Sequence, residues 1–354
     1  MKKIVIALFA LLIITELSAQ SAQTEDFLYA IKDTDTLYLT KYECASAQRK
    51  IEGARPAVIF VFGGGFFTGS RNAEYFQDYI THLTEGGYTL FTIDYRLGLK
   101  KYYEAIDAEK IATGKAPKKS YVDFIKALKL SVDMAVEDLF SATAFILSRA
   151  QEWNIDTASI VVSGSSAGAI TALQSEYYIC NWRSGGKTQP WDEMVAILPE
   201  NFNYAGVVSY AGAIMNIDSK LEWNTPSAPM ALFHGDIDPT VPYNRIWVPM
   251  VGKLNGSKKV AESLDKAGTP YMFFTYNKQK HNIASEPMNS DLELLDFFLH
   301  KLVKEKKPLV VNSSINDLSI KKMSKRQAKR DAKKENEAYQ SGDHSFGREN
   351  KEKK

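Results

Sequence analysis

The chain has 354 residues, and 45% of them are hydrophobic, so it can bury the core of a large globular domain. Its formal net charge is only +2, but residues 301–354 hold 16 Lys and Arg against 8 Asp and Glu. A basic tail therefore follows a mildly acidic body, and the charge of the whole chain says little about the folded part.

Residues 1–20 are typical of a secretory signal. Lys2 and Lys3 precede the apolar stretch Ile4–Ile14, which is too short to span a bilayer, and small residues at 18–22 offer cleavage sites. No cysteine lies near them, so we expect no lipid anchor. The alternative is an uncleaved N-terminal anchor. We expect a secreted or periplasmic protein without a stable membrane anchor, which makes nucleic acid an improbable partner for the basic tail.

Strand and helix signals alternate between residues 35 and 303. The strand segments are short, apolar and β-branched, as strands covered on both faces are, and the helical segments carry apolar residues three and four apart. This alternation predicts an α/β fold with a mostly parallel, doubly wound sheet and helices on both faces. The expected strands are 36–40, 57–62, 89–93, 160–162, 205–210, 230–233 and 271–276, and the expected helices are 72–86, 134–153, 167–179 and 291–303.

Two stretches interrupt the alternation. Leu99–Leu130, rich in lysine and tyrosine, is an insertion that forms either a lid or a peripheral pair of helices. Asn181–Asn203 is a second candidate wall of a pocket, and for both stretches we favour surface decoration over contact with substrate. After Lys304 the apolar periodicity fades, so we expect one domain over residues 21–303 and a basic, disordered tail over 304–354.

The pentapeptide Gly164–Gly168 has the pattern G-x-S-x-G, directly after the β-branched run Ile160–Val162. The segment from Ala167 to Ile179 is compatible with a helix. A strand, a tight turn and a helix in this order form a nucleophile elbow, in which only small residues fit around the turn. Ser166 is therefore the candidate nucleophile, and an incidental turn of small residues is the alternative.

A serine hydroxyl needs a base to take its proton, and an acid to hold that base in the right tautomer. Of five histidines, two precede the expected acid, one lies in the last helix and one in the tail. His281 follows the strand at 271–276, where catalytic groups gather in open α/β sheets. It is the candidate base. The other four histidines are His82, His234, His300 and His344.

The candidate acid lies in Met230–Pro242, a buried strand that runs into a turn. The turn offers Asp236 and Asp238. We favour Asp238, because Asp236 follows a glycine and is better placed to brace the turn by bonds to the backbone. His234, at the end of the strand, is expected to be packed and hydrogen-bonded.

The tetrahedral intermediate of acyl transfer needs N–H donors for its oxyanion. Three glycines within Phe62–Phe66 follow a buried strand and let the backbone approach a ligand. The amide of Ala167, directly after the nucleophile, is the second expected donor site. A phosphate-binding glycine loop is disfavoured, because neither G-x-G-x-x-G nor Lys-Ser/Thr is present.

These motifs together give the chain a resemblance to a known family. With FGGGF at 62–66, DYRLG at 94–98, GSSAG at 164–168 and HGDID at 234–238, residues 35–303 resemble an α/β-hydrolase of the esterase and lipase superfamily. The similarity is greatest to the branch with a glycine-triplet oxyanion motif, which has feruloyl/acetyl-xylan-esterase-like and hormone-sensitive-lipase-like members. At the position of Phe62, many relatives have a histidine that usually braces the glycine loop. The absence of this histidine puts the rigidity of the loop, more than the chemistry, in doubt.

The resemblance implies an α/β-hydrolase fold and a role for each matching residue. Position by position, it implies Ser166, Asp238 and His281 as nucleophile, acid and base, and Gly64, Gly65 and Ala167 as oxyanion donors. We therefore expect an exported serine esterase that acts on a small-molecule or carbohydrate ester, with short or aromatic acyl groups preferred.

Two other classes of function stay open. A serine peptidase of the dipeptidyl or prolyl type has the same triad order, but it usually brings a large propeller or cap domain, for which this chain has no room before the hydrolase domain. The second alternative is a catalytically inactive binding protein with the hydrolase fold. No metal or cofactor is implied, because no cluster has ligand spacing. The sequence determines neither the oligomeric state nor whether Cys44 and Cys180 are buried thiols or a disulfide.

Overall fold

The structure is a computed structural model that describes residues 23–44, 53–115, 117–118, 120–182, 191–200, 202–216, 220–248 and 252–318. The expected signal segment at 1–20 lies outside these residues, as does the tail from 319 onward.

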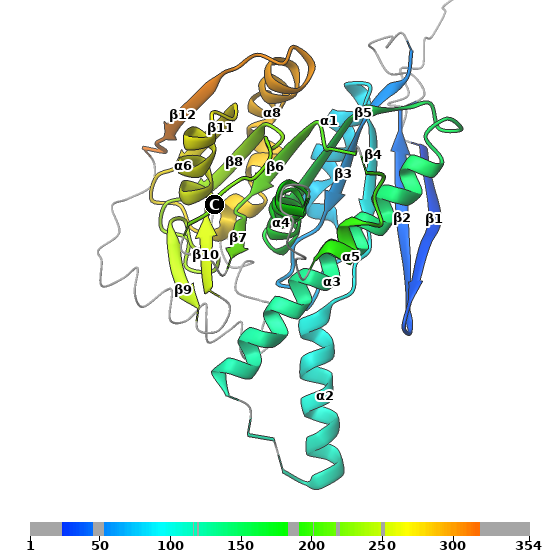
Figure 1. Ribbon diagram of the computed structural model, residues 1–354, viewed down its shortest axis with the longest axis vertical. Coiled ribbons are helices and arrows are strands. Elements are labelled where there is room, and N and C mark those ends of the chain that lie inside the picture. The colour runs from blue at the N-terminus through cyan, green and yellow to red at the C-terminus, as the bar shows by residue number, and fades with distance from the viewer. Residues whose placement is uncertain are drawn as a thin grey trace, which may run out of the picture.

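A large mixed sheet runs through the middle of the molecule (Figure 1). In the described residues its strands are β1 (Gln23–Lys32), β2 (Asp35–Glu43), β3 (Arg55–Val61), β4 (Thr89–Ile93), β5 (Ile155–Ser165), β6 (Gly206–Tyr210), β8 (Met230–Gly235), β11 (Tyr271–Tyr276) and β12 (Val310–Ile315). Their order in the sheet is β1-β2-β4-β3-β5-β6-β8-β11-β12. β1 and β2 pair antiparallel, as do β2 and β4, and every other neighbouring pair is parallel.

Helices cover both faces of this sheet. In Figure 1, α3 (Tyr121–Ser148), α4 (Ala167–Trp182) and α6 (Ser257–Ala267) lie on one face, and α1 (Gln77–Glu85) and α8 (Leu292–Phe298) lie on the other. α8 continues into a π-helical turn, Leu299–Lys304. The short helices are η1 (Glu74–Phe76), α5 (Asp192–Val195), η2 (His281–Ala284) and α7 (Pro287–Ser290), and a small antiparallel sheet contains β7 (Ala213–Asn216), β9 (Arg245–Val248) and β10 (Gly252–Gly256).

The central strands are buried on both faces. Every residue of β4, β6, β8 and β11 is buried, because helices cover the sheet above and below. Such strands carry continuous apolar runs instead of an alternating pattern, and these runs made the parallel sheet predictable. The arrangement brings the carboxyl ends of β3, β5, β8 and β11 to one edge of the sheet.

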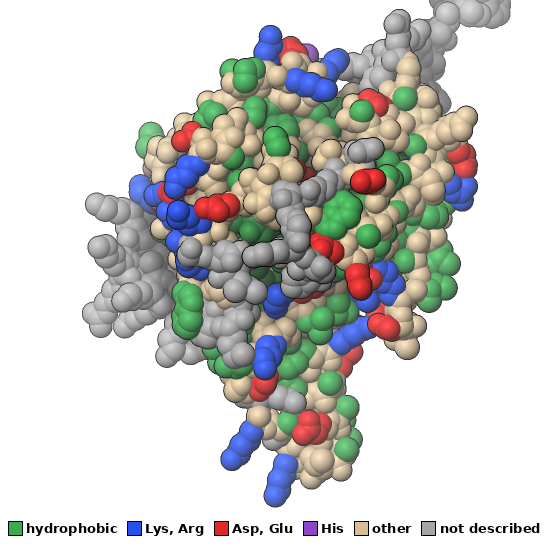
Figure 2. Space-filling view, in the orientation of Figure 1, with side chains coloured by type: hydrophobic (Ala, Val, Ile, Leu, Met, Phe, Trp, Pro, Cys, Tyr) green, Lys and Arg blue, Asp and Glu red, His purple; other side chains and the backbone are tan. Residues whose placement is uncertain are grey.

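The insertion expected at 99–130 is a helical arm. α2 (Gly98–Thr113) and the first half of α3 project from the body as a hairpin (Figure 1), and lysine side chains stand at its free end (Figure 2). A capping box begins α3, because Ser120 accepts a hydrogen bond from Asp123 N and the Asp123 carboxylate accepts one from Ser120 N. At the base of the arm, Leu99 N donates to Phe66 O at 3.1 Å, so the arm is joined to the glycine loop.

The domain boundary expected at residue 303 is wrong. β12 pairs with β11 in parallel register and forms the last strand of the large sheet. Its side chains alternate between exposed and half-buried, because an edge strand has neighbours on one side only. Val310–Ile315 therefore lacks the apolar run that marks a central strand. For this reason the loss of apolar periodicity after Lys304 indicated the start of the tail, although the sheet has one more strand.

Cys44 and Cys180 are both buried and are not joined in a disulfide. The Cys180 thiol donates to Glu176 Oε1 at 3.4 Å. Of the helices in the described ranges, none combines the length and the apolar character that crossing a bilayer requires.

A buried ion pair joins the segment after β4 to α3. Arg96 Nε donates to both carboxylate oxygens of Asp138 at 3.0 Å, and Arg96 N donates to Asp138 Oδ2 at 2.7 Å. The Asp138 side chain is fully buried. We expect Asp138→Ala to lower the free energy of unfolding by about 3 kcal/mol, because it leaves the buried guanidinium without this partner.

Urea denaturation measures this loss, and Glu152→Ala is the matched control. Glu152 pairs with Arg149 on the surface, so its removal should cost less than about 1 kcal/mol. Equal losses in the two variants would contradict a structural role for the buried pair.

Candidate active site

The three predicted triad residues meet at the carboxyl edge of the sheet. Ser166 follows β5, Asp238 follows β8, and His281 begins η2 after β11. Ser166 Oγ lies 2.7 Å from His281 Nε2, and His281 Nδ1 lies 2.7 Å from Asp238 Oδ2. An ionised carboxylate only accepts hydrogen bonds, so Nδ1 donates to Asp238 and Nε2 accepts from the serine hydroxyl. This geometry suits general-base activation of Ser166.

The backbone holds Ser166 in a left-handed turn, with φ of 52°. A non-glycine residue with positive φ is strained, and such strain at a sharp strand-to-helix turn is the mark of a nucleophile elbow. Ser166 N donates to Tyr210 O at 2.8 Å, which holds the turn against the end of β6. Ser166 remains partly exposed.

Asp238 is a buried carboxylate with bonds to each oxygen. Its Oδ1 accepts from Thr240 N at 2.8 Å and from Val241 N at 3.0 Å, while Oδ2 faces His281. Burial alone would raise the pKa of Asp238, but His281 and His234 outweigh it and hold this pKa well below its usual range. The side chain is therefore ionised at neutral pH.

Asp236 and His234, which lie close to the triad in sequence, have structural contacts instead. Asp236 Oδ1 accepts from Lys278 N at 2.6 Å, which braces the loop before His281. His234 is fully buried, with Nδ1 2.8 Å from Ser257 Oγ and Nε2 3.2 Å from Val241 O. His234 Nε2 also lies 3.3 Å from Asp238 Oδ2, so the oxygen that faces His281 has a second histidine beside it.

The glycine loop after β3 lies against the elbow. A Cβ atom on Gly63 would lie 3.2 Å from Ser166 Cβ and 3.1 Å from Ser165 Oγ. Gly64 O accepts from Phe67 N and Thr68 N at 3.1 and 3.0 Å, which closes the loop into a turn. Gly64 has φ of 135°, and a Cβ there would lie 2.0 Å from Thr68 O, so only glycine fits.

Amide donors are available on both sides of Ser166. In the part of the chain that the structure describes, none of the backbone hydrogen bonds of turns and loops uses the N–H group of Gly64, Gly65 or Ala167 as its donor. Ala167 is the first residue of α4, where backbone N–H groups lack partners within the helix and the dipole favours negative charge. This arrangement suits the binding of an oxyanion.

Sequence reasoning missed two residues of this site, Tyr75 and Ser165. The Tyr75 hydroxyl accepts from Gly63 N at 2.9 Å, and Ser165 Oγ donates to Ala284 O at 2.6 Å. Neither residue lies at a motif position that marks such a role. Tyr75 is brought to the loop by η1, whose position depends on the packing of α1 against the sheet.

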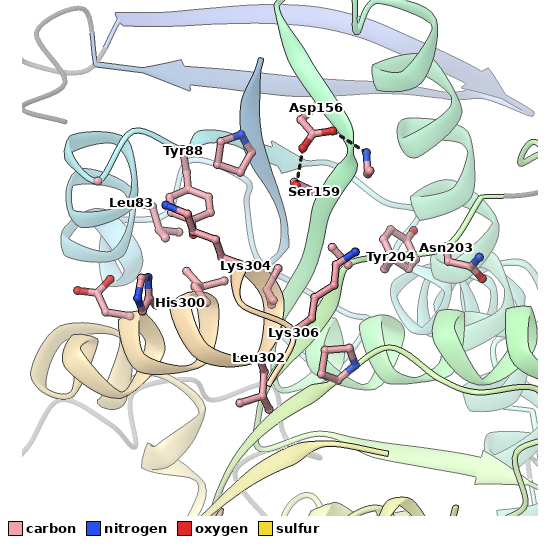
Figure 3. Close-up of a pocket in the computed structure, with 18 of the residues that line it drawn as sticks. Leu83, Tyr88, Asp156, Ser159, Asn203, Tyr204, His300, Leu302, Lys304 and Lys306 are labelled. Atoms are coloured by element: carbon pink, nitrogen blue, oxygen red, sulfur yellow. Dashed lines mark hydrogen bonds between the residues drawn. The ribbon is translucent and has the colours of Figure 1, made fainter. Parts of the chain in front are cut away.

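A groove of about 2000 Å³ lies at the opposite edge of the sheet (Figure 3). Its lining comes from the amino ends of strands, including Ala54 before β3 and Pro229 before β8, and from His300, Lys304 and Lys306 on and after the π-helical turn. The groove contains no triad residue and is separate from the candidate active site. Within the described ranges, no group of three His, Cys, Asp or Glu side chains is arranged to hold a metal ion.

Comparison with known proteins gives structural matches only. No protein-family model and no curated protein sequence matches the chain. The fold is similar to that of esterase 2 from Thermogutta terrifontis. Its apo form, its butyrate-bound form and the form phosphorylated by paraoxon each match with a TM-score of 0.52 and 20% identity, over 79% of this chain and 94% of that chain. The strand order, the helices on both faces and these matches define an α/β-hydrolase fold.

Proposed function

We propose that this protein is a serine carboxylic-ester hydrolase. Ser166 Oγ attacks the ester carbonyl carbon, and His281 Nε2 takes the serine proton and passes it to the leaving alcohol. The resulting acyl-enzyme is hydrolysed by a water that His281 activates in the same way, and Asp238 holds the imidazole throughout. Gly64, Gly65 and Ala167 supply N–H groups to the oxyanion.

One observation carries the proposal: the continuous hydrogen-bonded chain from Ser166 through His281 to Asp238 at the carboxyl edge of the sheet. The glycine loop beside it strengthens the case, because a nucleophile without oxyanion donors would gain little from its base. The structural matches agree with this chemistry, because esterase 2 from Thermogutta terrifontis has structures with butyrate or propionate bound and with paraoxon phosphorylation.

The substrate class and the location of the enzyme are further parts of the proposal. Short or aromatic acyl esters of carbohydrate are the proposed substrates, on the strength of the motif resemblance and of the signal-like residues 1–20. Cleavage of that segment would release a secreted or periplasmic enzyme.

The test is covalent labelling combined with substrate ranking. We expect paraoxon to inactivate the protein with one diethylphosphoryl group per chain, and peptide mass spectrometry to place it on Ser166. We also expect turnover of p-nitrophenyl esters from acetate to decanoate, with the short esters fastest, and of a ferulate ester.

Two variants complete the experiment. Ser166→Ala should take up no label, whereas Ser159→Ala, in the first half of β5, should be labelled at the wild-type rate. Label at another residue, or ester turnover that persists after Ser166→Ala, would contradict the proposed mechanism.

A further inference from the structure

A tyrosine hydroxyl holds the glycine loop in the position that the proposed chemistry requires. Gly63 N donates to the Tyr75 hydroxyl at 2.9 Å. Gly63 directly precedes Gly64 and Gly65, whose amides are the proposed oxyanion donors. The direction of those two N–H groups depends on the peptide plane that Tyr75 fixes. Tyr75 itself is half-buried and packs edge-to-face on Phe76, with ring centroids 4.8 Å apart.

Ser165 lies against the same peptide. Its side chain is buried, and a Cβ atom on Gly63 would lie 3.1 Å from Ser165 Oγ. The Ser165 hydroxyl donates its proton to Ala284 O at 2.6 Å. Ala284 belongs to η2, the short helix that begins with His281.

We propose that Tyr75 and Ser165 are positioning residues, which together hold the oxyanion loop, the nucleophile elbow and the helix of the catalytic base in their relative positions. Tyr75 accepts from Gly63 N–H in the loop, and Ser165, in the elbow, donates to Ala284 O in the helix. The inference rests on the proposed esterase function, because it assigns these residues to the same site. The role assigned to both side chains is to position other groups of the site, without contact with the substrate.

The hydrogen bond to Tyr75 also braces a loop that lacks the histidine of many relatives. Phe62 stands at that position and packs its ring on Tyr95, with centroids 4.5 Å apart, while the Tyr95 hydroxyl donates to Phe62 O at 3.0 Å. Tyr95 therefore fixes the start of the loop, and Tyr75 fixes the next peptide. Two tyrosines on different segments do what a single histidine is expected to do.

The test compares Tyr75→Phe with Tyr79→Phe. Tyr75→Phe keeps the ring but removes the acceptor of Gly63 N–H. Misplacement of reacting groups by about 1 Å costs up to about 100-fold in rate, so we expect kcat for p-nitrophenyl acetate to fall about 10- to 100-fold with KM within twofold. Tyr79 is fully buried and donates to Ser163 Oγ at 2.8 Å, so Tyr79→Phe removes a comparable hydroxyl away from the loop. It should leave kcat within twofold.

A double variant tests whether the two residues act together. Ser165→Ala should lower kcat to a similar extent, and the kcat of Tyr75→Phe/Ser165→Ala should lie no more than about threefold below that of the slower single variant, because both side chains hold the same part of the site. Multiplicative losses in the double variant would overturn joint positioning.

A measurement independent of catalysis separates this inference from the function on which it rests. Amide hydrogen exchange, followed by mass spectrometry, should accelerate in peptides that cover residues 62–66 in Tyr75→Phe and stay unchanged there in Tyr79→Phe. Unchanged exchange in both variants, or a Tyr75→Phe enzyme with wild-type kcat, would overturn the positioning role. If the wild-type protein hydrolyses no ester, the proposed function fails while the exchange result still decides whether Tyr75 fixes the loop.

Discussion

Asp238→Asn is expected to lower kcat by about three to four orders of magnitude, with little change in KM. The reason is the tautomer of His281. The Oδ1 position accepts two backbone N–H groups, from Thr240 and Val241, so an asparagine places its oxygen there and its NH₂ group toward His281. His281 Nδ1 then has to accept, and the proton moves to Nε2, where it blocks uptake of the Ser166 proton. Loss of the correct tautomer in a triad costs about 10⁴ in kcat.

Steady-state kinetics with p-nitrophenyl acetate measure this loss, and Asp236→Asn is the matched control. Asp236 lies two residues earlier and bonds to Lys278 N instead of the histidine, a bond that asparagine keeps. We expect Asp236→Asn to stay within threefold of wild type. A larger loss of kcat in Asp236→Asn than in Asp238→Asn would show that Asp236, and not Asp238, is the acid of the triad.

The same substitution changes the response of stability to acid. The pKa of Asp238 is lower in the folded state than the value near 3.9 of an unfolded chain. The ionised side chain therefore stabilises the fold above about pH 4, and this contribution is lost as the pH falls toward the folded-state pKa. Between pH 5 and pH 2, the free energy of unfolding should therefore fall less in Asp238→Asn than in the wild type.

Gly168→Ala is expected to lower the free energy of unfolding by about 3 kcal/mol or more, and to lower kcat with it. A Cβ atom at Gly168 would lie 2.0 Å from Val61 O and 2.6 Å from Phe62 O. These are backbone atoms of the strand and loop before Gly63, so no side chain can rotate away. The start of α4 has to separate from the end of β3, which moves the elbow away from the oxyanion loop.

Gly114→Ala provides the comparison for this second prediction. Gly114 ends α2 with φ of 70°, and a Cβ there would meet no atom within 4 Å. Its substitution should cost only the strain of a left-handed residue, about 1 kcal/mol. Chemical denaturation of both variants measures the difference. Equal losses would show that the close contact between α4 and β3 relaxes without cost.

The sequence carried enough information to predict the sheet and the residues that meet in the triad. Central strands have continuous apolar runs because helices cover both faces, and the nucleophile elbow needs a fixed pattern of small residues. Strand ends are where open sheets gather side chains, so Ser166, Asp238 and His281 could be assigned to one edge before the structure was known. Their hydrogen bonds agree with that assignment, and their catalytic roles stay a proposal.

The features that could not be predicted from the sequence are those with neither an apolar run nor a motif. β12 alternates between exposed and half-buried positions, and much of β1 is exposed, so each has only weak period-two hydrophobicity. Tyr75 and Ser165 were missed for a different reason. Their contacts join segments that meet only when the sheet, η1 and η2 are packed together, and no local spacing encodes that meeting.

The separation of these segments along the chain has a consequence for folding. Ser166 and His281 are 115 residues apart, and Ser165 and Ala284 are 119 apart. Such non-local contacts form slowly, since the loops between them must close before any contact is gained. An intermediate that lacks β11 has no base, and one that lacks β3 has no oxyanion loop. Recovery of ester hydrolysis should therefore lag behind recovery of helical circular dichroism on refolding, which would make catalysis a probe of the last step of assembly.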